Sequence, residues 1–193
     1  MMSSPEKSLD HNWLFFLCRE PSPEPSGLPK EYSIEMWKPR SGRFVPTGLP
    51  VMPFAVWSAF HYLRVFANRD YALLLIRFCG HLVHRSVITP GYFRFPFMER
   101  KDLQIGDTWT HDDHRGKGLA TFALRHITRC CGSGRRYWYV VSRDNASSIR
   151  VAQKAGFECA GLGKRAPRAR LNILGAFVLS NSLHLDAPEP LHE

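Results

Sequence analysis

The spacing of apolar positions divides the chain into short strands and three helices. Runs with period-two alternation, or with continuous β-branched and aromatic residues, are typical of strands. They predict strands over residues 13–19, 32–37, 71–78, 82–89, 103–110, 137–141, 157–162 and 171–179. Apolar positions three and four residues apart predict helices over residues 53–67, 119–131 and 146–155. A turn at Gly80 predicts an antiparallel hairpin.

This order predicts an α/β (α+β) protein with one main domain. Residues 1–10 are expected to be disordered, and several prolines between residues 21 and 29 indicate an irregular connector. We therefore divide the chain into an N-terminal arm with a short strand and the proline-rich connector (1–30), a single folded domain (31–180) and a C-terminal tail (181–193).

The composition is ordinary for a water-soluble globular protein, with 44% hydrophobic and 22% charged residues. The longest apolar runs are too short to span a bilayer, and the N-terminus lacks the apolar core of a signal peptide. We expect a cytoplasmic protein without a membrane partner. The five cysteines include no C-x-x-C pair, so neither a disulfide framework nor a zinc site is predicted.

A formal net charge of +9 favours an anionic partner. The densest basic cluster consists of Lys164, Arg165, Arg168 and Arg170, and a simple solvated surface remains the alternative for it. Elsewhere the basic residues are scattered, and the net charge is the one feature that favours binding to nucleic acid. We therefore predict no nucleic-acid partner.

The segment Asp113-His114-Arg115-Gly116-Lys117-Gly118-Leu119-Ala120 has the features of an anion-binding cradle. It follows a predicted strand and opens a predicted helix. Two glycines allow the backbone to approach a ligand closely, and the first helical turn offers free N–H groups. Arg115 and Lys117 add positive charge, so a diphosphate is the expected ligand.

The same segment resembles the Q/R-x-x-G-x-G/A motif of the GNAT superfamily of N-acetyltransferases, through Arg115, Gly118 and Ala120. About 30 residues later, Asn145-x-x-Ser148 and Lys154-Ala155-Gly156-Phe157 are similar to the family's second motif. Two short motifs in this order, with a strand between them, are far more specific than either motif alone.

The resemblance implies a single-domain acetyltransferase fold, with a mixed central sheet flanked by helices. In this family the strands before and after the cradle splay apart, and the pantetheine arm of acetyl-CoA lies between them. It thus implies acetyl-CoA as co-substrate, without a metal. The implied binding residues are Thr108, Trp109, Thr110, Arg115, Gly116, Lys117, Gly118, Leu119, Ala120, Asn145 and Ser148.

Acetyl transfer to a primary amine requires a base, because an alkylamine with a pKa of about 10.4 is protonated at neutral pH. Asp107 is the only acid in the strand before the cradle and is the candidate base. A structural contact between Asp107 and an arginine is the alternative. The family's usual acid, a tyrosine seven residues after the motif asparagine, is replaced here by Ala152. Tyr139 is the substitute candidate, and departure of the thiolate without acid help is the alternative.

The aromatic segment from Tyr92 to Phe97 lies between two predicted strands. It is either a wall of the acceptor site, with Tyr92, Phe93 and Arg94 as binding residues, or an apolar plug over the sheet. The cluster His111-Asp112-Asp113-His114 contains metal-ligand residue types, but a solvated loop is the favoured interpretation.

The leading prediction is an N-acetyltransferase that acts on a small amine, either anionic or linked to a nucleotide sugar. An acyl carrier protein as acyl donor is an alternative that suits the positive charge. A non-catalytic CoA-binding sensor is another, because the usual tyrosine is missing. Turnover would separate enzyme from sensor. The sequence leaves the acceptor, the acyl length and the oligomeric state open, a homodimer included.

Overall fold

A computed structural model describes residues 12–21, 27–40, 43–168 and 171–180. Residues 1–10, for which disorder was expected, and the tail 181–193 lie outside these residues. The described part contains eight strands and three α-helices in mixed order. The strands are β1 (Trp13–Cys18), β2 (Tyr32–Trp37), β3 (Ala72–Phe78), β4 (His81–Pro90), β5 (Leu103–Thr110), β6 (Tyr137–Ser142), β7 (Glu158–Arg168) and β8 (Leu171–Ser180). The helices are α1 (Val51–Tyr62), α2 (Leu119–Cys130) and α3 (Ala146–Lys154), with a short 3-10 turn η1 (Asp112–His114) before α2.

All eight strands belong to one sheet in the order β2-β3-β4-β5-β6-β1-β7-β8. Every pairing is antiparallel except the one between β5 and β6. The strand predicted in the N-terminal arm, β1, lies inside this sheet between β6 and β7. The prediction of an α/β (α+β) domain with a mixed central sheet is confirmed.

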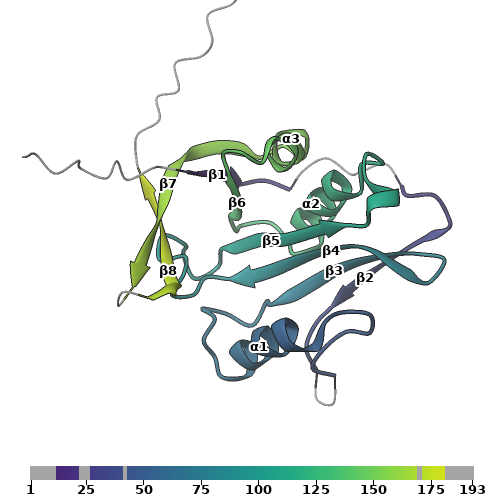
Figure 1. The fold of residues 1–193 in the computed structure, drawn as a ribbon, viewed down its shortest axis with the longest axis horizontal. Coiled ribbons are helices and arrows are strands. Elements are labelled where there is room, and N and C mark those ends of the chain that lie inside the picture. The colour runs from purple at the N-terminus through teal and green to yellow at the C-terminus, as the bar shows by residue number, and fades with distance from the viewer. Residues whose placement is uncertain (1–11, 22–26, 41–42, 169–170, 181–193) are drawn as a thin grey trace, which may run out of the picture.

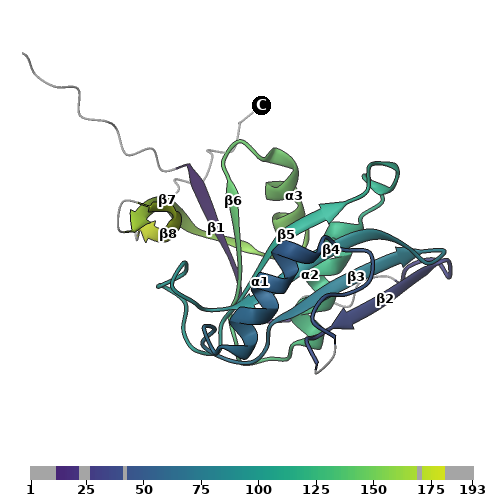
Figure 2. The same cartoon turned by 60° about the horizontal axis from the view of Figure 1, so that its bottom comes forward.

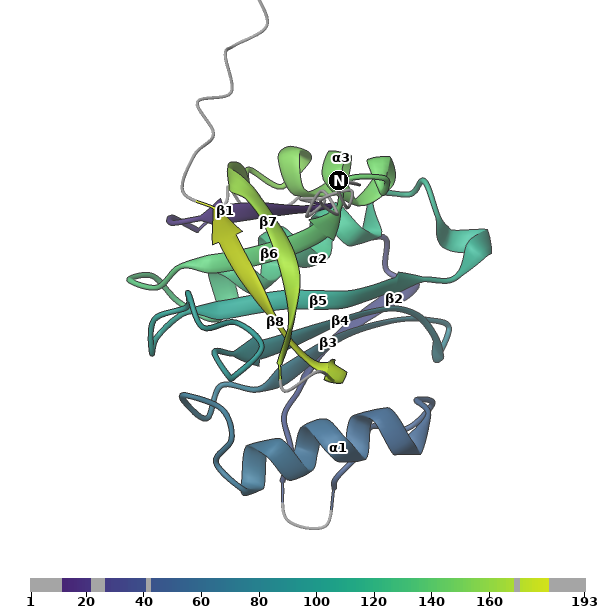
Figure 3. The same ribbon diagram turned by 60° about the vertical axis from the view of Figure 1, so that its left-hand side comes forward.

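The helices cover both faces of the sheet, as Figures 1 and 3 show, with α1 on one face and α2 and α3 on the other. Each face has its own buried apolar cluster. The cluster beneath α2 contains Phe122 and Ile127, and the cluster beneath α1 contains Phe54 and many aromatic rings. The sheet is thus buried on both faces, which explains the continuous apolar run Leu73–Ile76 in β3.

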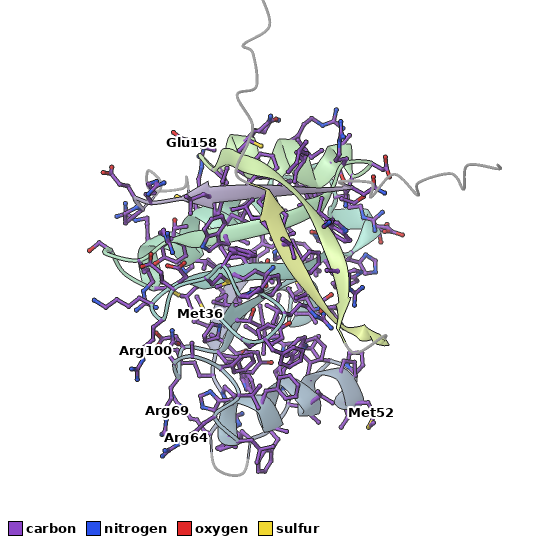
Figure 4. The ribbon with its side chains drawn as sticks, turned by 90° about the vertical axis from the view of Figure 1, so that its left-hand side faces the viewer. Met36, Met52, Arg64, Arg69, Arg100 and Glu158 are labelled. Atoms are coloured by element: carbon purple, nitrogen blue, oxygen red, sulfur yellow. The ribbon has the colours of Figure 1, made fainter. Side chains whose placement is uncertain are left out.

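Helix α1 differs from its expected span because its ends are set by backbone conformation. Pro53 occupies the first turn, where a missing N–H is tolerated, so the helix begins two residues earlier than expected. The helix ends at Tyr62, and Arg64 lies in the left-handed region with φ of 57°. In Figure 4, Met52 and Arg64 mark the two ends of α1.

The parallel pair β5–β6 is short and opens toward the end of both strands. Only three residue pairs join them, beginning with Leu103 and Tyr137 and ending with Ile105 and Tyr139. Beyond that point β5 continues to Thr110 and β6 to Ser142 without pairing to each other. Figure 2 shows β6 directed away from β5. The predicted splay of these two strands is confirmed, and it places a gap beside the loop before α2.

Candidate active site

The loop between β5 and α2 turns twice into the left-handed region of backbone conformation. Gly116 has a φ of 75° and Gly118 a φ of 79°. A Cβ added at either position would meet no atom within 4 Å, so conformation rather than lack of space favours glycine. Gly118 caps α2 without a side-chain hydrogen bond. The amide groups of the first turn therefore remain available for an anion.

Arg115 is held at the edge of this loop by two contacts within the loop. Its Nη2 atom lies 2.9 Å from Oδ1 of Asp112, and its Nε donates to the carbonyl oxygen of Thr110 over 3.3 Å. Both side chains of the ion pair are largely exposed, so the pair contributes little to folding. It orients a guanidinium group beside the cradle, where it adds positive charge to that of the helix N-terminus.

A cleft of about 630 Å³ runs from this cradle into the gap between β5 and β6. All the implied binding residues except Lys117 line it, and the candidate acid Tyr139 lines it as well. Asn145 caps α3, because its side chain accepts a hydrogen bond from the amide of Ser148 over 3.0 Å. The two motifs, which are about 30 residues apart in the sequence, thus border one site.

Further residues that the sequence analysis did not assign to binding also line the cleft, most of them from one face of α3. They are His114, Thr121, Ser147, Arg150, Val151 and Lys154. The positions 147, 150, 151 and 154 follow the three-to-four spacing of a helix face, so extending that face from Ser147 would have found them. Arg150 and Lys154 give the second wall of the cleft positive charge.

Asp107 lies at a β-bulge in β5. The register between β4 and β5 shifts between Arg85 and Val87, and Asp107 has a φ of 42°. Its carboxylate forms an ion pair with Arg85 over 3.2 Å, and the Arg85 guanidinium lies 5.5 Å from the ring centre of Phe54 in α1. The bulge therefore turns Asp107 toward α1, whereas regular alternation would place it on the same face as Leu103 and Ile105.

Tyr139 is the last residue of β6 that pairs with β5, so its ring lies where the strands begin to separate. The residue is 4% exposed, and its hydroxyl interacts with the side chains of Ser148 and Thr108. Burial raises the pKa of the phenol. Tyr139 is therefore a protonated hydroxyl at neutral pH, held between two further hydroxyl groups of the cleft.

A family model described as the acetyltransferase (GNAT) domain matches residues 31–158. The chain belongs to the GNAT acetyltransferase family. This match covers the cradle, the splayed strands and α3.

Several solved structures are similar to this chain at low sequence identity. A GCN5-related N-acetyltransferase from Sphaerobacter thermophilus is 18% identical, with a TM-score of 0.50, over 77% of this chain and 48% of that one. A Drosophila protein is 13% identical, with a TM-score of 0.52, over 77% of this chain and 47% of that one. An acetyltransferase from Novosphingobium aromaticivorans is 17% identical, with a TM-score of 0.45, over 77% of this chain and 60% of that one.

The chain spans 60% or less of the length of these three structures. A sequence search of curated proteins gave no significant match.

Ala152, the GNAT position usually occupied by an acidic tyrosine, is buried in the core beneath α2. Its exposed fraction is 0%, and its carbonyl oxygen accepts a hydrogen bond from the amide of Phe157 at the end of α3. The position is filled by packing rather than open to the cleft. Among the residues that line the cleft, Tyr139 is the phenol, and its role as an acid stays a prediction.

The aromatic segment after β4 packs on the α1 side of the sheet and does not line the cleft. Tyr92 and Phe95 are buried, and the ring of Phe95 stacks on Phe177 with ring centres 5.3 Å apart. Burial raises the pKa of Tyr92 to about 12. Phe93 and Arg94 are half-buried at the edge of this cluster. The acceptor role assigned to this segment stays a prediction.

The histidine-rich loop before the cradle is occupied by contacts among its own residues and with β2. His114 Nδ1 lies 2.9 Å from the hydroxyl of Tyr32, and His111 Nδ1 lies 3.7 Å from a carboxylate oxygen of Asp113. Within the ranges that the structure describes, no three His, Cys, Asp or Glu side chains are grouped as a metal site requires. None of the helices in those ranges has the length and apolar character needed to cross a bilayer.

Proposed function

We propose that this protein transfers an acetyl group from acetyl-CoA to a primary amine of a small substrate by direct attack. One observation carries the proposal: the gap between β5 and β6 opens into a cleft that ends at the glycine cradle. A ligand with a diphosphate at one end and an extended arm at the other fits such a site. On the edge that faces β6, the backbone of residues 106–110 has no strand partner and offers strand-like hydrogen bonds to an amide-bearing arm.

The residues of the cleft suit acetyl-CoA in charge as well as in shape. The amides of the first turn of α2 and the side chain of Arg115 would hold the pyrophosphate, and Arg150 and Lys154 line the same cleft. Acetyl-CoA supplies an activated thioester when it is bound. The positive net charge of +9 attracts such a polyanion from solution.

The bulge in β5 supports a division of proton transfer between the two faces of the sheet. Asp107 is turned toward the α1 face, and the next residue, Thr108, contacts Tyr139 on the cleft face. We assign Asp107 to accept the proton of the attacking ammonium group, directly or through water. Tyr139 then gives its proton to the departing thiolate.

The acceptor would approach from the α1 side, because the cleft side is taken by the donor. Arg85 and the edge of the aromatic segment near Arg94 lie on that side, and both offer positive charge. This arrangement supports a small anionic amine, such as an amino sugar linked to a nucleotide. A cytoplasmic location stays a prediction.

The proposal is tested by measuring CoA release with a panel of small amines, under acetyl-CoA and under longer acyl-CoAs. We expect turnover with acetyl-CoA and at least one amine, and none in Gly118→Asp. Binding of acetyl-CoA without turnover on any amine would instead favour a CoA-binding sensor. Turnover only with acylated acyl carrier protein would assign that protein as the donor.

A further inference from the structure

A continuous path of polar side chains runs from β4 through β5 to β6, next to the cleft. In β4, Nδ1 of His84 lies 2.8 Å from Oγ1 of Thr110, and Nε2 of His84 lies 3.1 Å from Oγ of Ser86. The Ser86 hydroxyl lies 3.3 Å from Oγ1 of Thr108, and the side chain of Thr108 interacts in turn with the hydroxyl of Tyr139. Five side chains from β4, β5 and β6 thus form one path.

The two ends of this path are in the cleft, and its middle is sealed from solvent. Thr110 and Tyr139 both line the cleft, whereas His84 and Ser86 have an exposed fraction of 0%. A buried histidine flanked by apolar strands costs free energy unless both ring nitrogens are satisfied. Here each nitrogen has its own hydroxyl partner, and neither partner is a charged group.

His84 has the electrical state that a relay requires. Burial, with a smaller contribution from the positive charge of the neighbouring Arg85, lowers the pKa of His84 to about 4, so the ring is neutral at neutral pH. A neutral imidazole carries one N–H and one lone pair. It passes a proton by accepting at one nitrogen and donating from the other, which exchanges its two tautomers.

We propose that the path Thr110–His84–Ser86–Thr108–Tyr139 delivers a proton to Tyr139 during acetyl transfer, with His84 as the positioning residue that sets its direction. The inference rests on the proposed function, because it needs a departing thiolate in the cleft. It goes beyond that function by naming the source from which Tyr139, the substitute for the missing family tyrosine, regains its proton.

The proton balance of the step closes without another cofactor. Tyr139 gives its O–H proton to the CoA thiolate, and Thr108 passes its own hydroxyl proton to the Tyr139 oxygen. Ser86 then protonates Thr108, and Nε2 of His84 protonates Ser86. Thr110 donates to Nδ1 of His84 and takes a proton from water in the cleft, and a proton that the amine releases through Asp107 neutralises the remaining hydroxide. One C–S bond and one N–H bond are broken, one C–N bond and one S–H bond are formed, and His84 ends as the other neutral tautomer.

The path is tested with variants that keep its shape but stop proton transfer. His84→Gln retains a donor and an acceptor but cannot exchange tautomers, and Ser86→Ala interrupts the middle of the path. A matched control is Thr89→Val, because Thr89 is also buried in β4, and its hydroxyl donates to Gln104 over 3.0 Å on the other face. Thr108→Val removes the hydroxyl that joins Ser86 to Tyr139 in the path.

We expect kcat to fall by about 10²-fold in His84→Gln, Ser86→Ala and Thr108→Val, with the KM for acetyl-CoA within about twofold of wild type. The proton inventory in mixtures of H2O and D2O should curve in wild type, where several protons move together, and become linear in Ser86→Ala. Thr89→Val should lose thermal stability to a similar extent but keep the wild-type kcat.

Two results would overturn the relay, and they are distinguishable. Wild-type turnover with an unchanged kcat in Ser86→Ala and Thr108→Val would show that the path is structural, and the proposed function would stand. A wild-type protein that binds acetyl-CoA but acetylates no amine would overturn the relay together with the proposed function. A His84→Gln protein that does not fold leaves the decision to the Ser86 and Thr108 variants.

Discussion

Substitution of Gly118 separates the backbone geometry of the cradle from its charge. Gly118 is exposed, with a φ of 79° and a ψ of 2°, and an added Cβ would meet no atom within 4 Å. A non-glycine residue therefore fits there at the cost of left-handed strain alone, about 1–2 kcal/mol. Asn and Asp have the same shape and both tolerate this conformation better than other residues. The pair Gly118→Asn and Gly118→Asp thus differs by one negative charge.

That charge should dominate the loss of acetyl-CoA affinity. A carboxylate about 5 Å from one phosphate charge is repelled by about 0.8 kcal/mol in bulk water and by about 3.3 kcal/mol at an effective dielectric of about 20. Two phosphate charges roughly double the repulsion, so a rise in Kd of about 10²-fold is expected. With acetyl-CoA at about 100 times the wild-type Kd, its stabilisation falls from about 2.7 to about 0.4 kcal/mol.

The measurement is thermal unfolding with and without acetyl-CoA at low ionic strength, where the repulsion is least screened. For a chain of 193 residues, each kcal/mol shifts Tm by about 2–4 °C. The wild-type shift of about 5–11 °C should shrink to about 1 °C in Gly118→Asp and stay larger in Gly118→Asn. Equal shifts in wild type and in a folded Gly118→Asp protein would refute the cradle.

Three further outcomes follow from the site. Asp107→Asn should lower kcat while acetyl-CoA binding stays intact. Normal turnover of this variant from pH 6 to 9 would show that Asp107 acts only through its structural ion pair with Arg85. Arg94→Ala should raise the acceptor KM and leave acetyl-CoA affinity unchanged, whereas a loss of Tm alone would identify its segment as a plug. Because the pKa of His84 is lower in the folded protein, the unfolded chain binds the proton more tightly. The contribution of neutral His84 to the free energy of unfolding is therefore fully present above pH 6.5 and declines as the pH falls toward 4. The free energy of unfolding measured with urea should be about 2 kcal/mol lower at pH 5 than at pH 7 in wild type, and the difference should be much smaller in His84→Gln.

The element pattern was predictable because each strand and helix carries its own periodicity. The strand Leu103–Thr110 agrees with its prediction at both ends, and Asn145 caps α3 as its side chain suggests. The cradle was predictable for a similar reason, since Gly116 and Gly118 are needed at left-handed positions that follow directly in the sequence. Local physics and local sequence agree at these places.

Relations between distant strands were not predictable from a single sequence. Nothing in residues 13–19 indicates that β1 enters the middle of the sheet, because the insertion depends on pairing with β6 and β7. The bulge at Asp107 is equally hidden, since it arises from a register shift against β4. The chain through His84 depends on both the register and the bulge. In the sequence, its serine and threonine residues look like any other polar residues that alternate with apolar residues along a strand.

The bulge connects these findings, because one extra residue in β5 decides which side chains meet. Without it, strict alternation would place Asp107 on the face of Ile105, in line with the α2 cluster, and would turn Thr108 toward α1. With it, Asp107 reaches Arg85 on the α1 side, and Thr108 meets Ser86 and Tyr139 on the cleft side. The candidate base Asp107 and the candidate acid Tyr139 thus lie on opposite faces of the sheet, beside the gap between β5 and β6. In the proposed reaction, proton removal from the amine and proton delivery to the sulfur would then take place on separate faces of the sheet, at one position in β5.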